Sequence, residues 1–133
     1  DAYNSGESHI RPVKSPNTVA KSLAIGNPAD GIYAIAALRQ SGGSAVSVPE
    51  EEIVQGIQLL AETEGIFTET AGGVVIAGLR QIVKNNGIQS DEPTVAFITG
   101  NGLKTLEAVE HIVDTVPILA TVDSFADAIA KRS

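Results

Sequence analysis

The segment Thr99-Gly100-Asn101-Gly102 has the residue types expected of a ligand-binding turn. It follows residues 93–98, an apolar run that predicts a buried strand, and open parallel sheets bind ligands beyond the carboxyl ends of their strands. A hydroxyl at position 99 can donate or accept a hydrogen bond, and the two glycines let the backbone approach a flat ligand closely. A plain glycine turn that closes a strand is the alternative, and the four residues alone favour it.

Two other glycine-loop chemistries can be tested on the same stretch. A phosphate-binding loop of the nucleotide-hydrolase type needs four residues between two glycines and a glycine directly before the lysine, but Leu103 precedes Lys104. A dinucleotide fingerprint needs a third glycine three residues after the second, where Thr105 stands. The sequence fits neither pattern.

A second candidate is Glu69, which directly precedes the expected start of a helix. The small residues at 71–73 would leave the amino end of that helix open to a ligand, although a carboxylate there also serves the helix dipole, worth about 0.3 to 1 kcal/mol.

A third candidate is Asn27 within Ile25-Gly26-Asn27-Pro28, which taken alone is a loop and a helix cap. His9 and His111 are isolated and have no second ligand at metal spacing, so no metal site is predicted.

Helices and strands are predicted to alternate and to position these residues. Helices are expected where apolar residues recur every three or four positions behind a capping residue, and strands where β-branched residues run together. The expected helix caps are Asn27, Ser47 (in a capping box with Glu50), Thr70, Thr105 and Asp123, and the expected strands cover residues 44–48, 93–99 and 117–122. This alternation is typical of an α/β fold with three layers, in which a largely parallel sheet has helices on both faces.

Composition excludes several classes of function. The 133 residues suffice for one domain, with an aliphatic core because aromatic residues make up only 4%. The chain has no cysteine, so it has no thiolate nucleophile and no disulfide, which agrees with a cytoplasmic location. A net charge of −7 disfavours nucleic-acid binding, and the apolar runs are far shorter than a membrane span of about 20 residues.

The chain divides into two parts by polarity. Residues 1–17 are polar, contain glycine and proline, and are expected to form a loop or a partly disordered lead-in. Residues 18–133 carry all the candidate residues. Since the chain lacks an initiator methionine and starts with loop-like sequence, we interpret it as a piece of a longer protein.

Three motifs in order resemble the threonine synthase family of fold-type II pyridoxal-phosphate enzymes. They are Ile25 to Pro28, Glu64 to Glu69, and the Thr-Gly-Asn-Gly-Leu-Lys run from Thr99 to Lys104. The resemblance covers about residues 15–112. It implies that residues 18–133 are the C-terminal portion of the catalytic domain, because the family's Schiff-base lysine and glycine-rich phosphate cradle lie upstream of these motifs.

The resemblance implies that pyridoxal 5′-phosphate binds at the Gly-Asn-Gly turn. The hydroxyl of Thr99 would face the pyridine nitrogen of the cofactor, and Glu69 would lie near the same edge of the ring. Gly100 and Gly102 would allow the ring to pack close to the backbone, and Asn101 between them would belong to the same cofactor-binding turn. A neutral hydroxyl, unlike a carboxylate, does not hold the nitrogen protonated, so the ring is a weaker electron sink.

The resemblance also implies a substrate cleft lined by Asn27 and a reaction for the parent enzyme: O-phosphohomoserine and water give threonine and phosphate. A related lyase, such as a threonine deaminase or a cysteate synthase-like enzyme, fits the same motifs, and a non-catalytic acidic binding module is a further alternative. The expected partners are the upstream part of the same enzyme, an amino-acid substrate and, in a homodimer, a second copy.

The sequence departs from the family pattern at two points. Thr70 stands where family members often have proline. None of the five lysines, Lys14, Lys21, Lys84, Lys104 and Lys131, lies in the context of the Schiff-base lysine. We therefore expect no catalytic residue in this piece and no activity from it alone.

Overall fold

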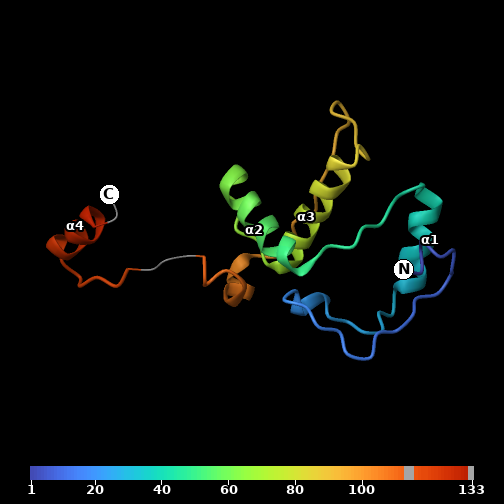
Figure 1. Ribbon diagram of the computed structural model, residues 1–133, viewed down its shortest axis with the longest axis horizontal. Helices are drawn as coiled ribbons and strands as arrows, with labels where there is room; N and C mark the ends of the chain where they lie inside the picture. Colours follow the sequence, from blue (N-terminus) through green and yellow to red (C-terminus); the bar gives the residue numbers. More distant parts are fainter. Residues whose placement is uncertain (113–115, 132–133) are drawn as a thin grey trace.

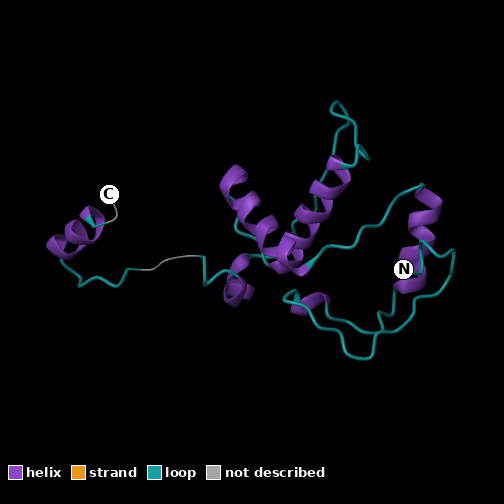
Figure 2. Cartoon of the chain, viewed as in Figure 1, coloured by secondary structure: helices purple, strands orange, loops and turns teal. Residues whose placement is uncertain are grey.

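The computed structural model describes residues 1–112 and 116–131, and their regular elements are all helical (Figure 1). Figure 2 draws helices and loops in this part of the chain, without a strand arrow. The elements are the 3₁₀ helices η1 (Lys21–Leu23) and η2 (Gly102–Ala108) and the α-helices α1 (Gly31–Ser41), α2 (Glu50–Glu64), α3 (Thr70–Lys84) and α4 (Val122–Ala130).

The predicted parallel sheet is absent from the described residues. Residues 44–48, 93–99 and 117–121 form no strand, and residue 122 already belongs to α4. A strand needs a neighbouring strand to pair its backbone groups, and these segments find none within the described ranges. Their apolar side chains are instead exposed, with Val95 at 79% and Phe97 at 77%. The described residues therefore form no strand in these segments, and the three-layer sheet stays a prediction for the complete enzyme.

Glycine and asparagine end the helices as predicted. Gly42 follows α1 with φ 66°, a left-handed conformation that glycine adopts without a steric penalty. Asn86 follows α3 with φ 57°, and the Gly87 amide returns to the Ile82 carbonyl at 2.9 Å. The Gly42-Gly43 and Asn86-Gly87 stops are therefore confirmed.

The predicted helix starts were less accurate. Helix α1 follows Asp30 rather than Asn27, and α2 follows Pro49, without a side-chain capping bond from Ser47. The Glu50 carboxylate instead accepts a hydrogen bond of 2.8 Å from the Val19 amide, which ties the segment before η1 to α2. Thus the capping box was wrong because Glu50 has a more distant partner.

Helix α4 begins one residue before the predicted cap. Thr121 accepts a hydrogen bond from the Ser124 amide at 3.3 Å and so caps the helix. The helix lies apart from the others in Figure 1, with Val122 and Phe125 exposed. Within the described ranges, none of the helices is long and apolar enough to cross a membrane.

The core lies between α2 and α3, which pack together through glycines. A Cβ on Gly56 would lie 2.3 Å from the Gly73 carbonyl oxygen, and a Cβ on Gly73 would lie 2.5 Å from the Ile53 carbonyl oxygen. The two backbones therefore touch at this crossing. Apolar side chains from both helices are buried around it: Ile53, Ile57, Leu60 and Ala77. This pair of helices forms the rigid base on which the site residues stand.

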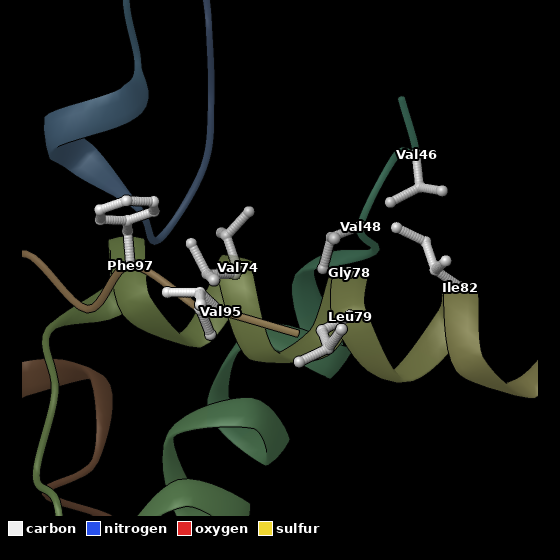
Figure 3. A pocket seen from close by; sticks show the side chains of 10 residues that line it. Val46, Val48, Val74, Gly78, Leu79, Ile82, Val95 and Phe97 are labelled. Atoms are coloured by element: carbon white, nitrogen blue, oxygen red, sulfur yellow. The ribbon is translucent and has the colours of Figure 1, made fainter. Parts of the chain in front are cut away.

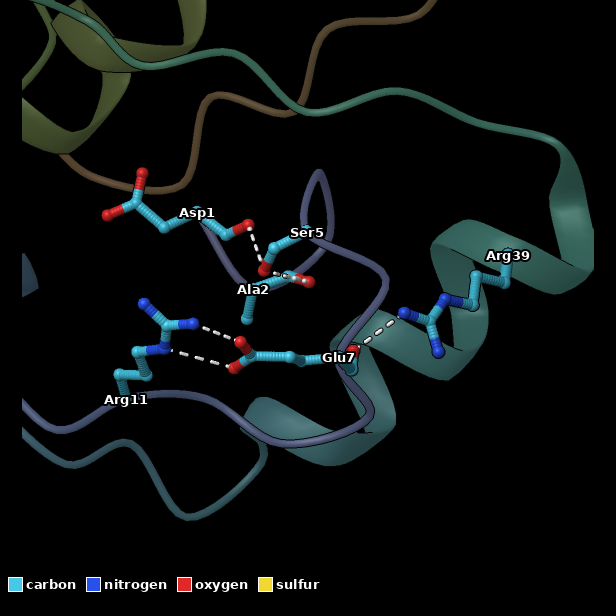
Figure 4. A network of polar contacts seen from close by, with 6 residues as sticks. All are labelled: Asp1, Ala2, Ser5, Glu7, Arg11 and Arg39. Atoms are coloured by element: carbon cyan, nitrogen blue, oxygen red, sulfur yellow. Dashed lines mark hydrogen bonds and ion pairs between the residues drawn. The ribbon is translucent and has the colours of Figure 1, made fainter.

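The first 17 residues are tied to α1 and its C-terminal end. The Tyr3 hydroxyl donates to the Gly43 carbonyl at 2.8 Å, and Arg39 donates to the Glu7 carbonyl at 2.6 Å. Figure 4 shows Glu7 between Arg39 and Arg11, and the hydrogen bond from Arg11 lowers the pKa of the Glu7 carboxyl. The division into a lead-in at 1–17 and a catalytic portion at 18–133 stays a prediction.

Candidate functional site

Two of the three predicted motifs meet in space. Thr68 and Asn101 form an isolated antiparallel bridge, so the loop before α3 pairs with the Gly-Asn-Gly turn. The bridge consists of hydrogen bonds from the Glu69 amide to the Gly100 carbonyl (3.2 Å) and from the Gly102 amide to the Phe67 carbonyl (3.0 Å), and the Thr68 hydroxyl adds one to the Gly100 carbonyl (3.0 Å). The sequence predicted the two candidates separately, and the structure brings them together.

The two glycines of the turn pack closely against side chains of the preceding loop. A Cβ on Gly100 would lie 1.8 Å from a Glu69 carboxylate oxygen, and one on Gly102 would lie 2.5 Å from the Phe67 ring. The space beside each glycine is therefore filled by Glu69 and Phe67. Contact between these glycines and a cofactor stays a prediction, and any ring must approach them from another side.

The small residues at the start of α3 have a similar explanation. A Cβ on Gly72 would lie 1.9 Å from the Thr68 hydroxyl oxygen, and Gly73 faces the backbone of α2. Thr68 and α2 thus occupy the space beside these two glycines, and the access of a ligand to the start of the helix stays a prediction. Glycine at these positions allows α3 to pack closely against Thr68 and α2, and Glu69 directly precedes the first turn of the helix.

Glu69 is nearly buried at the amino end of α3. Its side chain is 10% exposed, and the Lys104 ammonium lies 3.7 Å from one carboxylate oxygen. The positive end of the helix dipole favours a carboxylate at this position. Glu69 therefore lies between the amino end of α3 and Lys104, next to the turn at residues 99–102.

Thr70 and Thr105 connect the start of α3 to η2. The Thr105 hydroxyl accepts a hydrogen bond of 3.2 Å from the Thr70 amide, and Thr105 leaves the helical conformation at φ −139° and ψ 47°. The predicted helix from Thr105 to Ile112 is therefore replaced by the kinked η2. The hydroxyl of Thr70 is fully buried and has no hydrogen-bond partner among the described residues. Thr70 is the first residue of α3 rather than its cap.

Thr99 and Asn101 are both on the surface of the turn. Asn101 caps η2 by accepting a hydrogen bond from the Leu103 amide at 2.9 Å. Thr99 is exposed, and no hydrogen bond to its hydroxyl is found within the described part of the chain. The Thr99 hydroxyl is thus available to an external partner, as a cofactor contact requires.

Asn27 lies outside this group. It is exposed in the loop between η1 and α1, and no hydrogen bond or ion pair within the described ranges joins it to Glu69 or to residues 99–102. Shortly before the third motif, Lys21 of η1 pairs with Glu107 of η2 at 3.1 Å. The assignment of Asn27 to a substrate cleft stays a prediction.

Sequence reasoning missed the residues that hold the site together. Thr68 and Thr105 are buried polar residues, and Phe67 packs with Ile57, Ala108 and Val109 to anchor η2 against α2. The signal for Thr68 was its place inside the Glu64 to Glu69 motif. Thr105 was predicted only as a helix cap, and its contact with Thr70 had no local signal because the two residues are 35 positions apart.

An open apolar groove runs along α3 beside the site (Figure 3). Its volume is about 390 Å³, and it is lined by one face of α3 and by two of the segments predicted as strands. Val46 and Val48 come from the segment before α2, and Val95 and Phe97 come from the segment that ends at Thr99. The groove is therefore continuous in sequence with the candidate cofactor turn.

The family of pyridoxal-phosphate dependent enzymes matches residues 1–100. The chain belongs to this family.

Within the family, the chain is similar to threonine synthases. It is 39% identical over 133 residues to the threonine synthase of Methanosarcina acetivorans, covering 99% of this chain and 33% of that protein. It is 42% identical over 108 residues to that of Methanocaldococcus jannaschii, covering 81% and 27%. It is 38% identical over 114 residues to that of Halalkalibacterium halodurans, covering 86% and 32%. The predicted resemblance is confirmed, and the chain spans about a third or less of each of these relatives.

Proposed function

We propose that this chain is the C-terminal part of a pyridoxal-phosphate dependent threonine synthase, which converts O-phosphohomoserine and water to threonine and phosphate. The pairing of the Glu69 loop with the Thr99 turn carries the proposal, because it joins two family motifs into one surface. The relatives are threonine synthases, which supports this reaction together with the family motifs. The cytoplasm is the proposed location, and a homodimer is the proposed assembly.

The described residues are suited to contact one edge of the cofactor ring, but they do not supply the Schiff-base lysine or the phosphate site. Pyridoxal phosphate supplies an electron sink when bound, and this chain offers the exposed Thr99 hydroxyl to the pyridine nitrogen. Glu69 stands beside the same turn with a charge already paired by Lys104. Neither Lys104 nor Lys21, each in an ion pair, has the context of the Schiff-base lysine. That lysine and the phosphate site are therefore assigned to the upstream part of the enzyme.

The exposed apolar surface supports an upstream partner. The groove along α3 has valine side chains on both of its flanking segments and Phe97 on one of them, and contiguous apolar surface of this kind marks an interaction site. We assign the partner that covers this groove to the rest of the same enzyme. In the complete enzyme, residues 44–48 and 93–99 become strands of a three-layer α/β sheet because neighbouring strands are then present. Backbone amides of these segments should exchange slowly in the complete gene product and quickly in the isolated chain. Equal, rapid exchange in both would contradict this assignment.

Thr99→Val tests the cofactor contact. Valine keeps the shape of threonine but removes the hydroxyl, so a buried ring nitrogen loses a hydrogen bond worth about 1 to 3 kcal/mol. In the complete gene product, cofactor affinity and turnover of O-phosphohomoserine should both fall while thermal stability is retained. Thr94→Val, in the same segment but with its hydroxyl bonded to the Glu92 carbonyl at 3.2 Å, is the matched control and should leave both unchanged. Wild-type affinity and turnover in Thr99→Val would reject the contact.

The identity of the products separates the proposed reaction from its alternatives. A threonine synthase releases phosphate and threonine from O-phosphohomoserine, whereas a threonine deaminase would consume threonine and release a 2-oxo acid and ammonia. A cysteate synthase-like enzyme would form cysteate, and a binding module would do none of these. Assays of the complete gene product with each substrate therefore decide among them.

A further inference from the structure

Glu69 and Lys104 form an asymmetric ion pair. The Glu69 side chain is 10% exposed, whereas the Lys104 side chain is 63% exposed, and their charged atoms lie 3.7 Å apart. Lys104 belongs to η2, directly after the turn at residues 99–102. The lysine thus reaches from the solvent to a carboxylate that is almost enclosed.

The carboxylate of Glu69 has few other restraints. It packs against Gly100, and no hydrogen-bond donor to its oxygens is found among residues 1–112 and 116–131. Its main chain, by contrast, is fixed by the hydrogen bond to the Gly100 carbonyl. A nearly buried charge is unfavourable unless it is paired, so Lys104 has a strong influence on where this carboxylate lies.

Resting on the proposed function, we propose that Lys104 is a positioning residue for the cofactor site. It holds the Glu69 carboxylate against Gly100 and offsets its negative charge beside the turn at residues 99–102. Without Lys104, the carboxylate is unpaired and free to leave Gly100, so the charge and the shape of the surface that this turn offers to the cofactor both change. Lys104 itself contacts Glu69 rather than the reacting atoms.

The test is a pyridoxal phosphate titration of the complete gene product, read by the dissociation constant and by the absorption maximum of the bound cofactor. Lys104→Met should weaken binding by roughly fivefold, the size expected for a partly buried ion pair, and should shift the absorption maximum. Lys104→Arg should restore both to within about twofold. Lys21→Met removes the exposed pair with Glu107 on the same η2 and should change neither.

A second variant links the effect to Glu69. In a Glu69→Gln background, Lys104→Met should have little further effect, because the charge that Lys104 offsets is gone. The inference is overturned if Lys104→Met binds the cofactor like Lys21→Met, or if it lowers thermal stability while affinity and absorption stay unchanged. A wild-type protein that binds no pyridoxal phosphate would overturn both this inference and the proposed function, whereas normal wild-type binding with inert Lys104 variants would reject the inference alone.

Discussion

Replacing Gly73 by alanine should destabilise the fold, although alanine is the better helix former. A Cβ at position 73 would lie 2.5 Å from the Ile53 carbonyl oxygen and 2.8 Å from a side-chain carbon of Ile57. The backbone oxygen cannot rotate away, so α2 and α3 must separate and loosen the buried contacts between them. Overpacking of this kind costs about 1 to 3 kcal/mol, against a gain of about 1 kcal/mol in helix propensity. We expect a net loss of up to about 2 kcal/mol.

Gly78→Ala is the matched control on the same helix. A Cβ there would lie 3.3 Å from the end of the Val46 side chain, which is itself exposed and can move. The helix-propensity gain should therefore dominate, and stability should rise by up to about 1 kcal/mol. Urea unfolding of the 133-residue chain, followed by circular dichroism, measures both variants. If Gly73→Ala is as stable as Gly78→Ala, the close crossing of α2 and α3 is refuted.

Three further predictions concern buried polarity, pH and the missing lysine. Thr70→Val should raise the free energy of unfolding by about 1 kcal/mol in urea titrations, because it removes a buried hydroxyl without a partner; a loss of stability would mean that the hydroxyl is satisfied. The Thr18 hydroxyl and the Val19 amide lower the pKa of Glu50 from about 4.5, so this tie stabilises the fold above that pH and is lost as the pH falls through the lowered pKa. Glu50→Gln should abolish the corresponding acid titration of the Val19 amide resonance, and an unchanged titration would exclude Glu50 as its cause. Finally, the isolated chain mixed with pyridoxal phosphate and borohydride should show no stoichiometric label on one lysine, and such a label would place a Schiff-base lysine in this piece.

Helix ends and family motifs could be predicted from sequence because their causes are local. Gly42 and Asn86 end helices through their own backbone conformation, and the Thr99 to Lys104 motif is contiguous. The helix start at Glu50 was misassigned because its carboxylate bonds to Val19, 31 residues away. Close contact between Gly56 and Gly73 was likewise invisible, since a glycine in a helix gives no sign of what approaches it.

The strands were predicted from runs of β-branched and apolar residues. Such runs do not show whether a second strand is present to pair with them. Val95 and Phe97 have the residue types of a buried strand, yet they are exposed here because the described chain offers no strand beside them. The residues of the candidate site divide in the same way, into those that a local motif indicates and those that only a tertiary contact reveals. Glu69 and the turn at 99–102 were found by motif, whereas Thr105, which ties η2 to α3, depends on a tertiary contact.

The central claim is that this chain can serve as part of a threonine synthase. A chimera tests it directly: the segment of the Methanosarcina acetivorans threonine synthase that aligns with this chain, a third of that protein, is replaced by these 133 residues. We expect the chimera to bind pyridoxal phosphate and to release phosphate and threonine from O-phosphohomoserine, with turnover reduced by Thr99→Val. A chimera that folds and binds the cofactor but leaves O-phosphohomoserine unconverted would contradict the account.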